Sequence, residues 1–179
     1  AYEISTRDWS SDVCSSDLSG WNTITYAAQG TGDKTRGVQF NVSTVGWDHV
    51  VIGYDLRHSN TSSRYEQVQV TLDGVSFTDV ALFGADVAVG DTWYSQRTVD
   101  LSAMAGVANN ALFGFRVVAA FAPGGSGYVA STPGSSYGTS GTWRFDMVTV
   151  NAMPVPEPGT WALLLAGGAV VARVARRRG

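Results

Sequence analysis

The feature of this sequence that most constrains its fold is a repeated alternation of apolar and polar residues over short segments. Three segments show this pattern: Gly37–Thr44, His49–Arg57 and Tyr65–Leu72. Successive side chains of a β-strand point to opposite faces, so each segment would turn an apolar face to a core and a polar face outward. Charged residues make up 15% of the chain, below the usual share of about 25% in soluble domains. These observations predict an all-β fold.

Four further segments have the composition of strands: Val75–Val80, Thr92–Leu101, Leu112–Phe121 and Thr142–Asn151. Asp73-Gly74 stands between two strand segments and is a strong hairpin signal. Regular short strands without a long amphipathic helix predict a β-sandwich over residues 19–152, and we expect a jelly-roll-like arrangement. The formal net charge is −3, so no nucleic-acid partner is expected.

The N-terminal residues require separate treatment. Asp8–Leu18, which reads DWSSDVCSSDL, resembles residue for residue the translation of a common sequencing adapter. We therefore expect an artefact there, treat residues 1–18 as a leader of uncertain origin and expect the natural signal peptide to be missing. Cys14, the only cysteine, lies inside this run and supports no disulfide, metal or nucleophile argument. The alternative is a genuine linker rich in Ser and Asp.

The C-terminal residues combine an apolar stretch with a basic end. Gly159–Ala172 is fourteen residues without a charge, and Arg173 follows it. A transmembrane helix over about 159–175 would be about 25 Å long at about 1.5 Å per residue, slightly short of a hydrocarbon core of about 30 Å. Clustered arginines at the end predict that this end stays cytoplasmic and the domain lies outside. A buried core helix is the alternative.

Residues 153–179 resemble the PEP-CTERM sorting signal. The resemblance rests on three parts in order: Pro156, Glu157 and Pro158, then the apolar stretch, then Arg176, Arg177 and Arg178. It implies an exported protein of the cell surface or extracellular matrix, anchored through the inner membrane and processed by an exosortase. The exosortase and the membrane are therefore expected partners, with Pro156, Glu157 and Pro158 as the recognition element.

The segment before the tail resembles a sandwich domain that is common in PEP-CTERM and other secreted bacterial proteins. The matching pieces, in order, include Val70–Gly74, Val99–Leu101, Phe115–Val117 and Trp143–Asp146. Such domains are generally interpreted as carbohydrate-binding-like or adhesive modules. The resemblance thus implies a non-catalytic module that binds exopolysaccharide. A structural or adhesive surface protein without a small ligand is the alternative, and an uncharacterised secreted hydrolase is the third possibility.

The sequence offers little for catalysis. Asp55 and His58 lie three positions apart, which in an extended strand places them on opposite faces, and His58 is expected to be a polar loop residue. No phosphate-binding loop or zinc motif is present. We therefore expect that the protein is not an enzyme and has no cofactor other than a structural calcium ion. Jelly-roll modules often hold calcium through oxygen ligands, and Asp33 and Asp146 are the candidate ligands.

Sugar binding uses aromatic faces together with paired polar groups. The candidate ligand-binding residues are Trp47, Trp93, Arg57, Gln67, Gln69 and Arg116. The two tryptophans lie at strand starts, and the four polar residues lie opposite the apolar rows in a predicted strip that also contains Asp55. An ordinary solvated sheet face is the alternative for the strip. Trp143 shares a face with Phe145 and is expected in the core. We expect the Gly- and Ser-rich loop Ala122–Gly141 to be disordered in the free protein.

Overall fold

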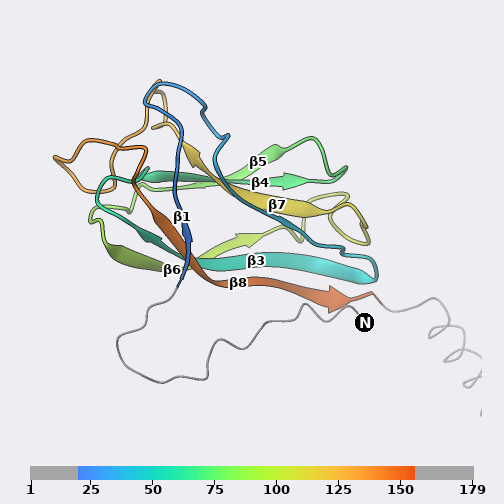
Figure 1. Ribbon diagram of the computed structural model, residues 1–179. Coiled ribbons are helices and arrows are strands. Elements are labelled where there is room, and N and C mark those ends of the chain that lie inside the picture. Colours follow the sequence, from blue (N-terminus) through green and yellow to red (C-terminus); the bar gives the residue numbers. More distant parts are fainter. Residues whose placement is uncertain (1–19, 156–179) are drawn as a thin grey trace, which may run out of the picture.

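The computed structural model describes residues 20–155, which form two four-stranded antiparallel sheets packed face to face (Figure 1). Sheet A contains, in spatial order, β1 (Trp21–Thr23), β8 (Trp143–Pro154), β3 (Trp47–His58) and β6 (Thr92–Asp100). Sheet B contains, in spatial order, β2 (Gly37–Asn41), β7 (Gly114–Ala120), β4 (Tyr65–Thr71) and β5 (Thr78–Phe83). The predicted all-β fold with two sheets is confirmed for this range.

The two ends of the chain lie outside the described residues, which include neither the leader 1–18 nor the expected helix at about 159–175. Within residues 20–155, no helix is long and apolar enough to cross a membrane.

The alternation of residues decides which side chains enter the core. In β3 the residues at even positions from Val50 to His58 are buried, and those between them are partly exposed. Trp143 and Phe145 on β8 are buried, as expected, and the ring of Phe145 packs against Tyr54 of β3. Full burial of a side chain of this size contributes about 1.5–3 kcal/mol. The core between the sheets therefore follows from the pattern read in the sequence.

The predicted strands are all present, with ends shifted by up to three residues, and two differences have a clear cause. The short strand β1 was not predicted, because its three residues carry no alternation that can be recognised. Strand β5 begins at Thr78 rather than at Val75. The cause is Asp73, whose Oδ1 accepts hydrogen bonds from the backbone N–H groups of Val75 (2.8 Å) and Ser76 (2.7 Å) and so holds a loop there.

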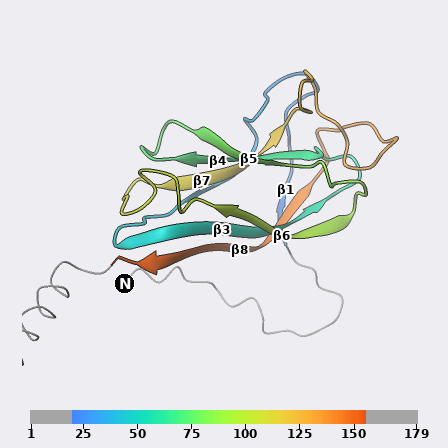
Figure 2. The same ribbon diagram turned by 180° about the vertical axis from the view of Figure 1, so that it is seen from behind.

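The connecting loops gather at two opposite ends of the sandwich. Loops 42–46, 72–77 and 101–113 lie at the end where β8 finishes, which we name the tail end (Figure 2). Hydrogen bonds join these loops: Asn110 Nδ2 donates to the Leu72 carbonyl (3.0 Å), Thr44 N to the Asn110 carbonyl (2.8 Å) and Gly46 N to Asn109 Oδ1 (2.9 Å). Loops 24–36, 59–64, 84–91 and 121–142 lie at the other end, the far end.

Loop Ala122–Gly141 was expected to be disordered, but the structure packs it against the far end. The rings of Tyr128 and Tyr137 stack with their centroids 4.5 Å apart. Their hydroxyls donate to the carbonyls of Gly32 (2.8 Å) and Ala27 (2.7 Å) respectively. Two tyrosines therefore anchor a segment whose composition alone suggested none of these contacts.

A buried ionic cluster links the two sheets. Glu66 faces the core from β4 and is fully buried, and Arg97 Nε of β6 donates to its Oε1 (2.8 Å). Arg97 also binds Asp86 through Nη1 (2.7 Å) and Nη2 (3.1 Å). Burial outweighs the attraction of Arg97 and raises the pKa of Glu66 to about 7. Glu66 is thus a core residue that titrates near neutrality.

His58 is buried in the core and is not a loop residue, because it ends β3 on the core face. Its Nδ1–H donates to the Ser63 carbonyl (2.9 Å), and its ring packs edge-on against Trp143. Burial lowers the pKa of His58 to about 4. The imidazole is therefore held neutral at physiological pH.

Glu66 and His58 should give opposite pH dependences of stability. Between pH 4.5 and 6.5 folded Glu66 keeps a proton that the unfolded chain loses, so its contribution falls as pH rises. Over the same range the unfolded chain protonates His58 and the folded protein does not, so that contribution rises with pH. Each of the two contributions changes the free energy of unfolding by about 1.4 kcal/mol per pH unit. Urea unfolding across this range should therefore show stability rising with pH in Glu66→Gln and falling in His58→Gln. Equal slopes in the two variants would contradict this assignment.

Candidate functional site

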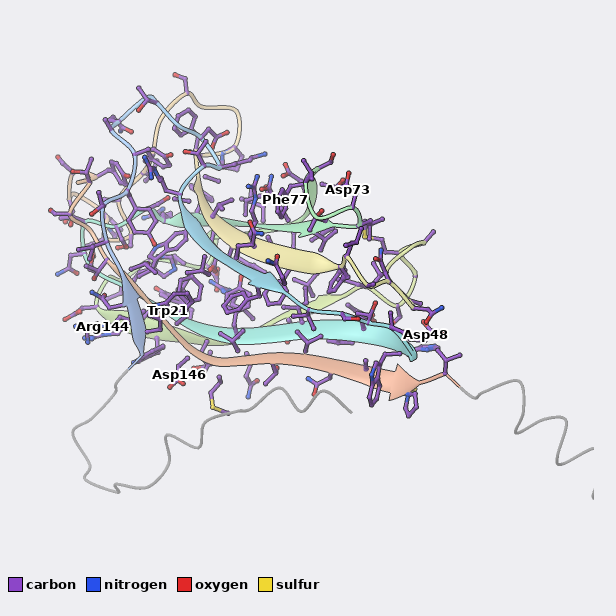
Figure 3. All side chains as sticks on the ribbon, turned by 45° about the vertical axis from the view of Figure 1, so that its right-hand side comes forward. Trp21, Asp48, Asp73, Phe77, Arg144 and Asp146 are labelled. Atoms are coloured by element: carbon purple, nitrogen blue, oxygen red, sulfur yellow. The ribbon has the colours of Figure 1, made fainter. Side chains whose placement is uncertain are left out.

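The outer face of sheet A carries a row of directly opposed polar and aromatic residues. Across β1, β8, β3 and β6 this row consists of Asn22, Arg144, Arg57 and Trp93. The next outward-facing pair, Asp146 on β8 and Asp55 on β3, lies beside it. These side chains point outward because their neighbours along the strands, such as Leu56 and Phe145, occupy the core. Figure 3 shows Arg144 and Asp146 on this side of the molecule.

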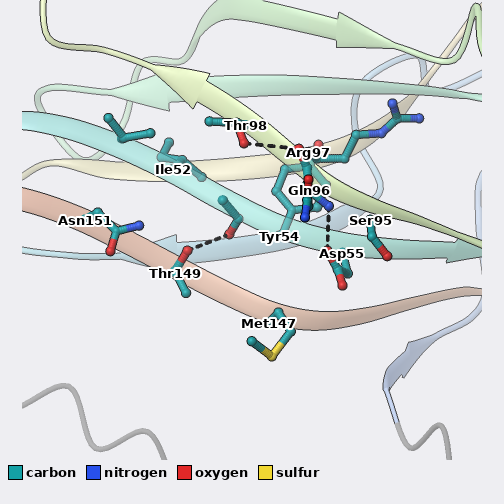
Figure 4. Close-up of a pocket in the computed structure, with 12 residues that line it drawn as sticks. Ile52, Tyr54, Asp55, Ser95, Gln96, Arg97, Thr98, Met147, Thr149 and Asn151 are labelled. Carbon is teal, nitrogen blue, oxygen red and sulfur yellow. Dashed lines mark hydrogen bonds between the residues drawn. The ribbon is translucent and has the colours of Figure 1, made fainter.

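Two β-bulges flank Asp55. On β6 the pair Ser95 and Gln96 opposes Asp55 alone, and on β8 the pair Met147 and Val148 opposes the next residue, Tyr54. Gln96 and Met147 have φ angles of 64° and 48°, which are uncommon outside glycine. Gln96 N donates to Asp55 Oδ1 (2.7 Å), a bond drawn in Figure 4. Bulges re-aim side chains and often lie beside functional sites.

The bulges border an open groove of about 450 Å³ on the outer face of sheet A (Figure 4). At the middle of this groove the hydroxyl of Thr149 packs closely over Gly53, because a Cβ at that position would lie 2.8 Å from Thr149 Oγ1. Hydroxyl, amide and carboxylate groups line it, from Asp55, Ser95, Gln96, Thr98, Thr149 and Asn151. The groove therefore offers both hydrogen-bond donors and hydrogen-bond acceptors.

The charges of the site are arranged as two like pairs. Arg57 and Arg144 are directly opposed on adjacent strands, as are Asp55 and Asp146. Arg57 Nη2 binds Asp91 Oδ1 (2.8 Å), whereas Arg144 makes no ion pair with any residue in the range 20–155. Like charges directly opposite one another destabilise a sheet. This cost is consistent with a surface that is kept for binding rather than for stability.

Two of the six ligand-binding candidates, Arg57 and Trp93, lie in this site. Trp93 packs against the backbone of Gly20, and its indole N–H is buried without a hydrogen-bond partner among the described residues. Trp47 lies at the other end of β3, ten residues from Arg57 and thus about 30 Å away at about 3.3 Å per residue. Trp47 is 44% exposed and belongs to the tail end. The two tryptophans therefore cannot share one site.

The remaining candidates, Gln67, Gln69 and Arg116, lie on the outer face of sheet B. Both glutamines are buried, and Arg116 Nε donates to Gln69 Oε1 (2.6 Å). The Arg116 guanidinium also lies 3.8 Å from the centroid of the Phe77 ring. The structure thus splits the predicted polar strip between opposite faces of the sandwich, because β3 belongs to sheet A while β4 and β7 belong to sheet B.

The two calcium candidates are not brought together. Asp33 lies in a far-end loop, where its Oδ1 accepts a hydrogen bond from Phe121 N (2.8 Å) beyond the end of sheet B. Asp146 lies on sheet A and accepts a bond from Met147 N (2.7 Å). Over residues 20–155 no group of three or more His, Cys, Asp or Glu side chains is placed to share a metal ion. The geometry therefore gives no support to the predicted calcium site.

Comparison with known protein families identifies the PEP-CTERM protein-sorting motif at residues 154–178. A search of curated proteins and a search of solved structures found no match. The motif indicates an exosortase-sorted protein of the cell envelope or surface. Its matched range begins at Pro154, the last residue of β8, and includes the predicted Pro-Glu-Pro element and terminal arginines. The sorting motif therefore begins where the sandwich ends.

Glycine should stabilise the protein at the two bulge positions where a residue other than glycine has a positive φ. Gln96→Gly and Met147→Gly each remove a side chain held at positive φ, and we expect gains of about 0.5–1 kcal/mol. Thr98→Gly, in the regular part of the same strand, is the matched control and should lose a similar amount because glycine weakens an extended strand. Urea unfolding measures all three. A loss of stability in both bulge variants would show that these backbones are not strained.

Proposed function

We propose that the protein is exported, anchored through the inner membrane by its tail and processed by an exosortase, and that its sandwich is a non-catalytic polysaccharide-binding module. The proposal of polysaccharide binding rests on the arrangement of side chains on the outer face of sheet A. There an aromatic ring, two arginines and two carboxylates adjoin an open groove that contains hydrogen-bonding side chains.

The chemistry of this face is suited to sugars. Sugar hydroxyls take hydrogen bonds from arginine and amide groups and give them to carboxylates, and sugar C–H faces pack on aromatic rings. Arg57, Arg144, Asp55 and Asp146 supply both donors and acceptors over a few neighbouring positions. The groove extends along the strands past Gly53 toward Asn151. This length favours a polymer over a single sugar.

The topology supports a jelly-roll interpretation of the domain, a fold that lectin domains also use. The spatial orders β1-β8-β3-β6 and β2-β7-β4-β5 mean that every connection except β4 to β5 crosses between the sheets. Eight strands arranged as two interleaved Greek keys are the definition of this fold. The architecture leaves the outer face of sheet A as a broad surface on which a polysaccharide can lie.

A hydrolase remains the competing proposal because of one observation. Asp55 and Asp146 face each other across adjacent strands, and paired carboxylates are the usual machinery of glycoside hydrolysis. Glu66, the only glutamate in the described range, cannot take part because it is fully buried between the sheets. A structural or adhesive role without a small ligand is the other alternative.

Substitutions on sheet A should weaken polysaccharide binding. Arg57→Gln and Trp93→Ala each remove a group from the proposed site, and we expect each to weaken binding by about tenfold, which corresponds to about 1.4 kcal/mol. Affinity electrophoresis of the detergent-solubilised protein against a polysaccharide panel, with and without calcium, measures this.

Arg116→Gln is the matched control, because it makes the same chemical change on the outer face of sheet B and should leave binding unchanged. Retardation lost equally in Arg57→Gln and Arg116→Gln would remove sheet A as the site. Absence of retardation by the folded wild type would favour the structural role. Release of reducing sugar that Asp55→Asn abolishes would assign a hydrolase.

The sorting function is tested separately from binding. Replacing Pro156 and Glu157 with alanine removes two residues of the proposed recognition element within the matched motif. In a host with an exosortase, the double variant should accumulate as unprocessed precursor, which an immunoblot detects. Alanine at Thr160 and Leu163, in the following stretch, is the control and should be processed normally. Normal processing of the Pro156/Glu157 variant would contradict the proposal.

A further inference from the structure

Exposed apolar side chains are concentrated at the tail end of the sandwich. Twelve large hydrophobic residues are exposed within the described range. Six of the twelve lie at the tail end, and we name them the apolar rim: Val45, Trp47, Val75, Leu112, Met153 and Val155. The far end has three, namely Ile24, Val89 and Val129. Single exposed apolar residues are normal, but a cluster around one end indicates a contact surface.

The rim is built from separate parts of the chain that the structure holds together. Val45, Val75 and Leu112 come from three different loops and are 54%, 80% and 59% exposed. The loops are joined through Thr44, Asn109 and Asn110, as described above. Several hydrogen bonds between the loops therefore hold these apolar side chains in positions where they are exposed to water.

The rim surrounds the point where the sorting motif begins. Val155 N donates to the Gly46 carbonyl (2.8 Å), and Pro154 is paired with Trp47. Four residue steps separate Val155 from Gly159, the first residue of the uncharged stretch. Four steps span at most about 14 Å. Any surface that takes up the uncharged stretch must therefore lie within this distance of the rim.

The charges near the rim exclude an anionic surface as the preferred partner. The tail-end loops 42–46, 72–77 and 101–113 contain no Lys or Arg. Asp48, Asp73 and Asp100 lie at or beside these loops, and Figure 3 places Asp48 and Asp73 at this end. Attachment to anionic lipid depends on basic residues, whereas apolar side chains and tryptophan enter the interface of neutral lipid.

We propose that the apolar rim lies in the headgroup interface of the membrane that receives Gly159–Ala172, on a zwitterionic lipid surface. This inference rests on the proposed anchoring of the tail, and it adds a second, peripheral contact made by the folded domain. The rim then holds the strands of the sandwich upright on the membrane. The far end points away from the lipid, and the proposed polysaccharide site on sheet A stands clear of the surface.

The test places an environment-sensitive fluorophore at single cysteines in the full chain, in a Cys14→Ser background. The labelled positions are Val45→Cys and Val75→Cys on the rim, Val89→Cys at the far end and Ala166→Cys in the uncharged stretch. Val89 is the matched control for Val45, because the two valines are 58% and 54% exposed. The protein is reconstituted in phosphatidylcholine vesicles with and without brominated lipid, which quenches only nearby fluorophores.

The expected result is that the Val45 and Val75 labels emit at shorter wavelength and are quenched, together with the Ala166 label, while the Val89 label is unaffected. Quenching at Ala166 with Val45 and Val75 indistinguishable from Val89 would overturn the rim contact and leave the anchoring intact. No quenching at Ala166 would overturn the anchoring and the rim contact together. Rim quenching that requires added phosphatidylglycerol would overturn the assignment to a zwitterionic surface.

Discussion

The pleat of β3 is the constraint on which the rest of the structure depends. This strand pairs with both β6 and β8, so it lies inside sheet A and its hydrogen-bonding edges are occupied on both sides. Its residues at even positions must then fill the core, where Tyr54 and Leu56 contact the facing sheet's apolar residues. Its residues at odd positions, Gly53, Asp55 and Arg57, are thereby committed to the outer face. A slip of one residue would bury those charges, which fixes the register.

The outer face acquires its shape from departures from that regular pleat. Each neighbour of β3 inserts an extra residue next to Asp55, and each insertion places a residue other than glycine at positive φ. Such conformations cost free energy and persist only where the surrounding structure enforces them. Here the core residues on either side, among them Arg97 and Phe145, are locked in place. The buried core therefore sustains the strain that opens the groove.

The sequence predicts the strands well because alternation is local, but it predicts their association poorly. Glu66 could have been placed in the core from its spacing to Val68 and Val70, yet nothing local identifies Arg97 as its partner. Likewise, the alternation predicts that Arg57 and Gln69 both face outward. They lie on opposite sides of the molecule because β3 belongs to sheet A and β4 to sheet B. The bulges are also invisible in the sequence, because neither Gln96 nor Met147 is a residue type that favours positive φ.

Trp47 and Trp93 show how one residue type takes two roles according to its place on the same sheet. Trp47 is the first residue of β3 and Trp93 is the second residue of β6, so the sequence alone suggests the same role for both. In the antiparallel sheet, however, β3 begins at the tail end and β6 begins at the far end, which separates the two rings by most of the length of β3. Trp93 therefore joins the polar row beside Arg57, whereas Trp47 lies next to the chain's exit at Pro154. The direction of the strands thus places the apolar rim and the proposed polysaccharide site on different parts of the sandwich, so that the proposed membrane contact would leave the outer face of sheet A free.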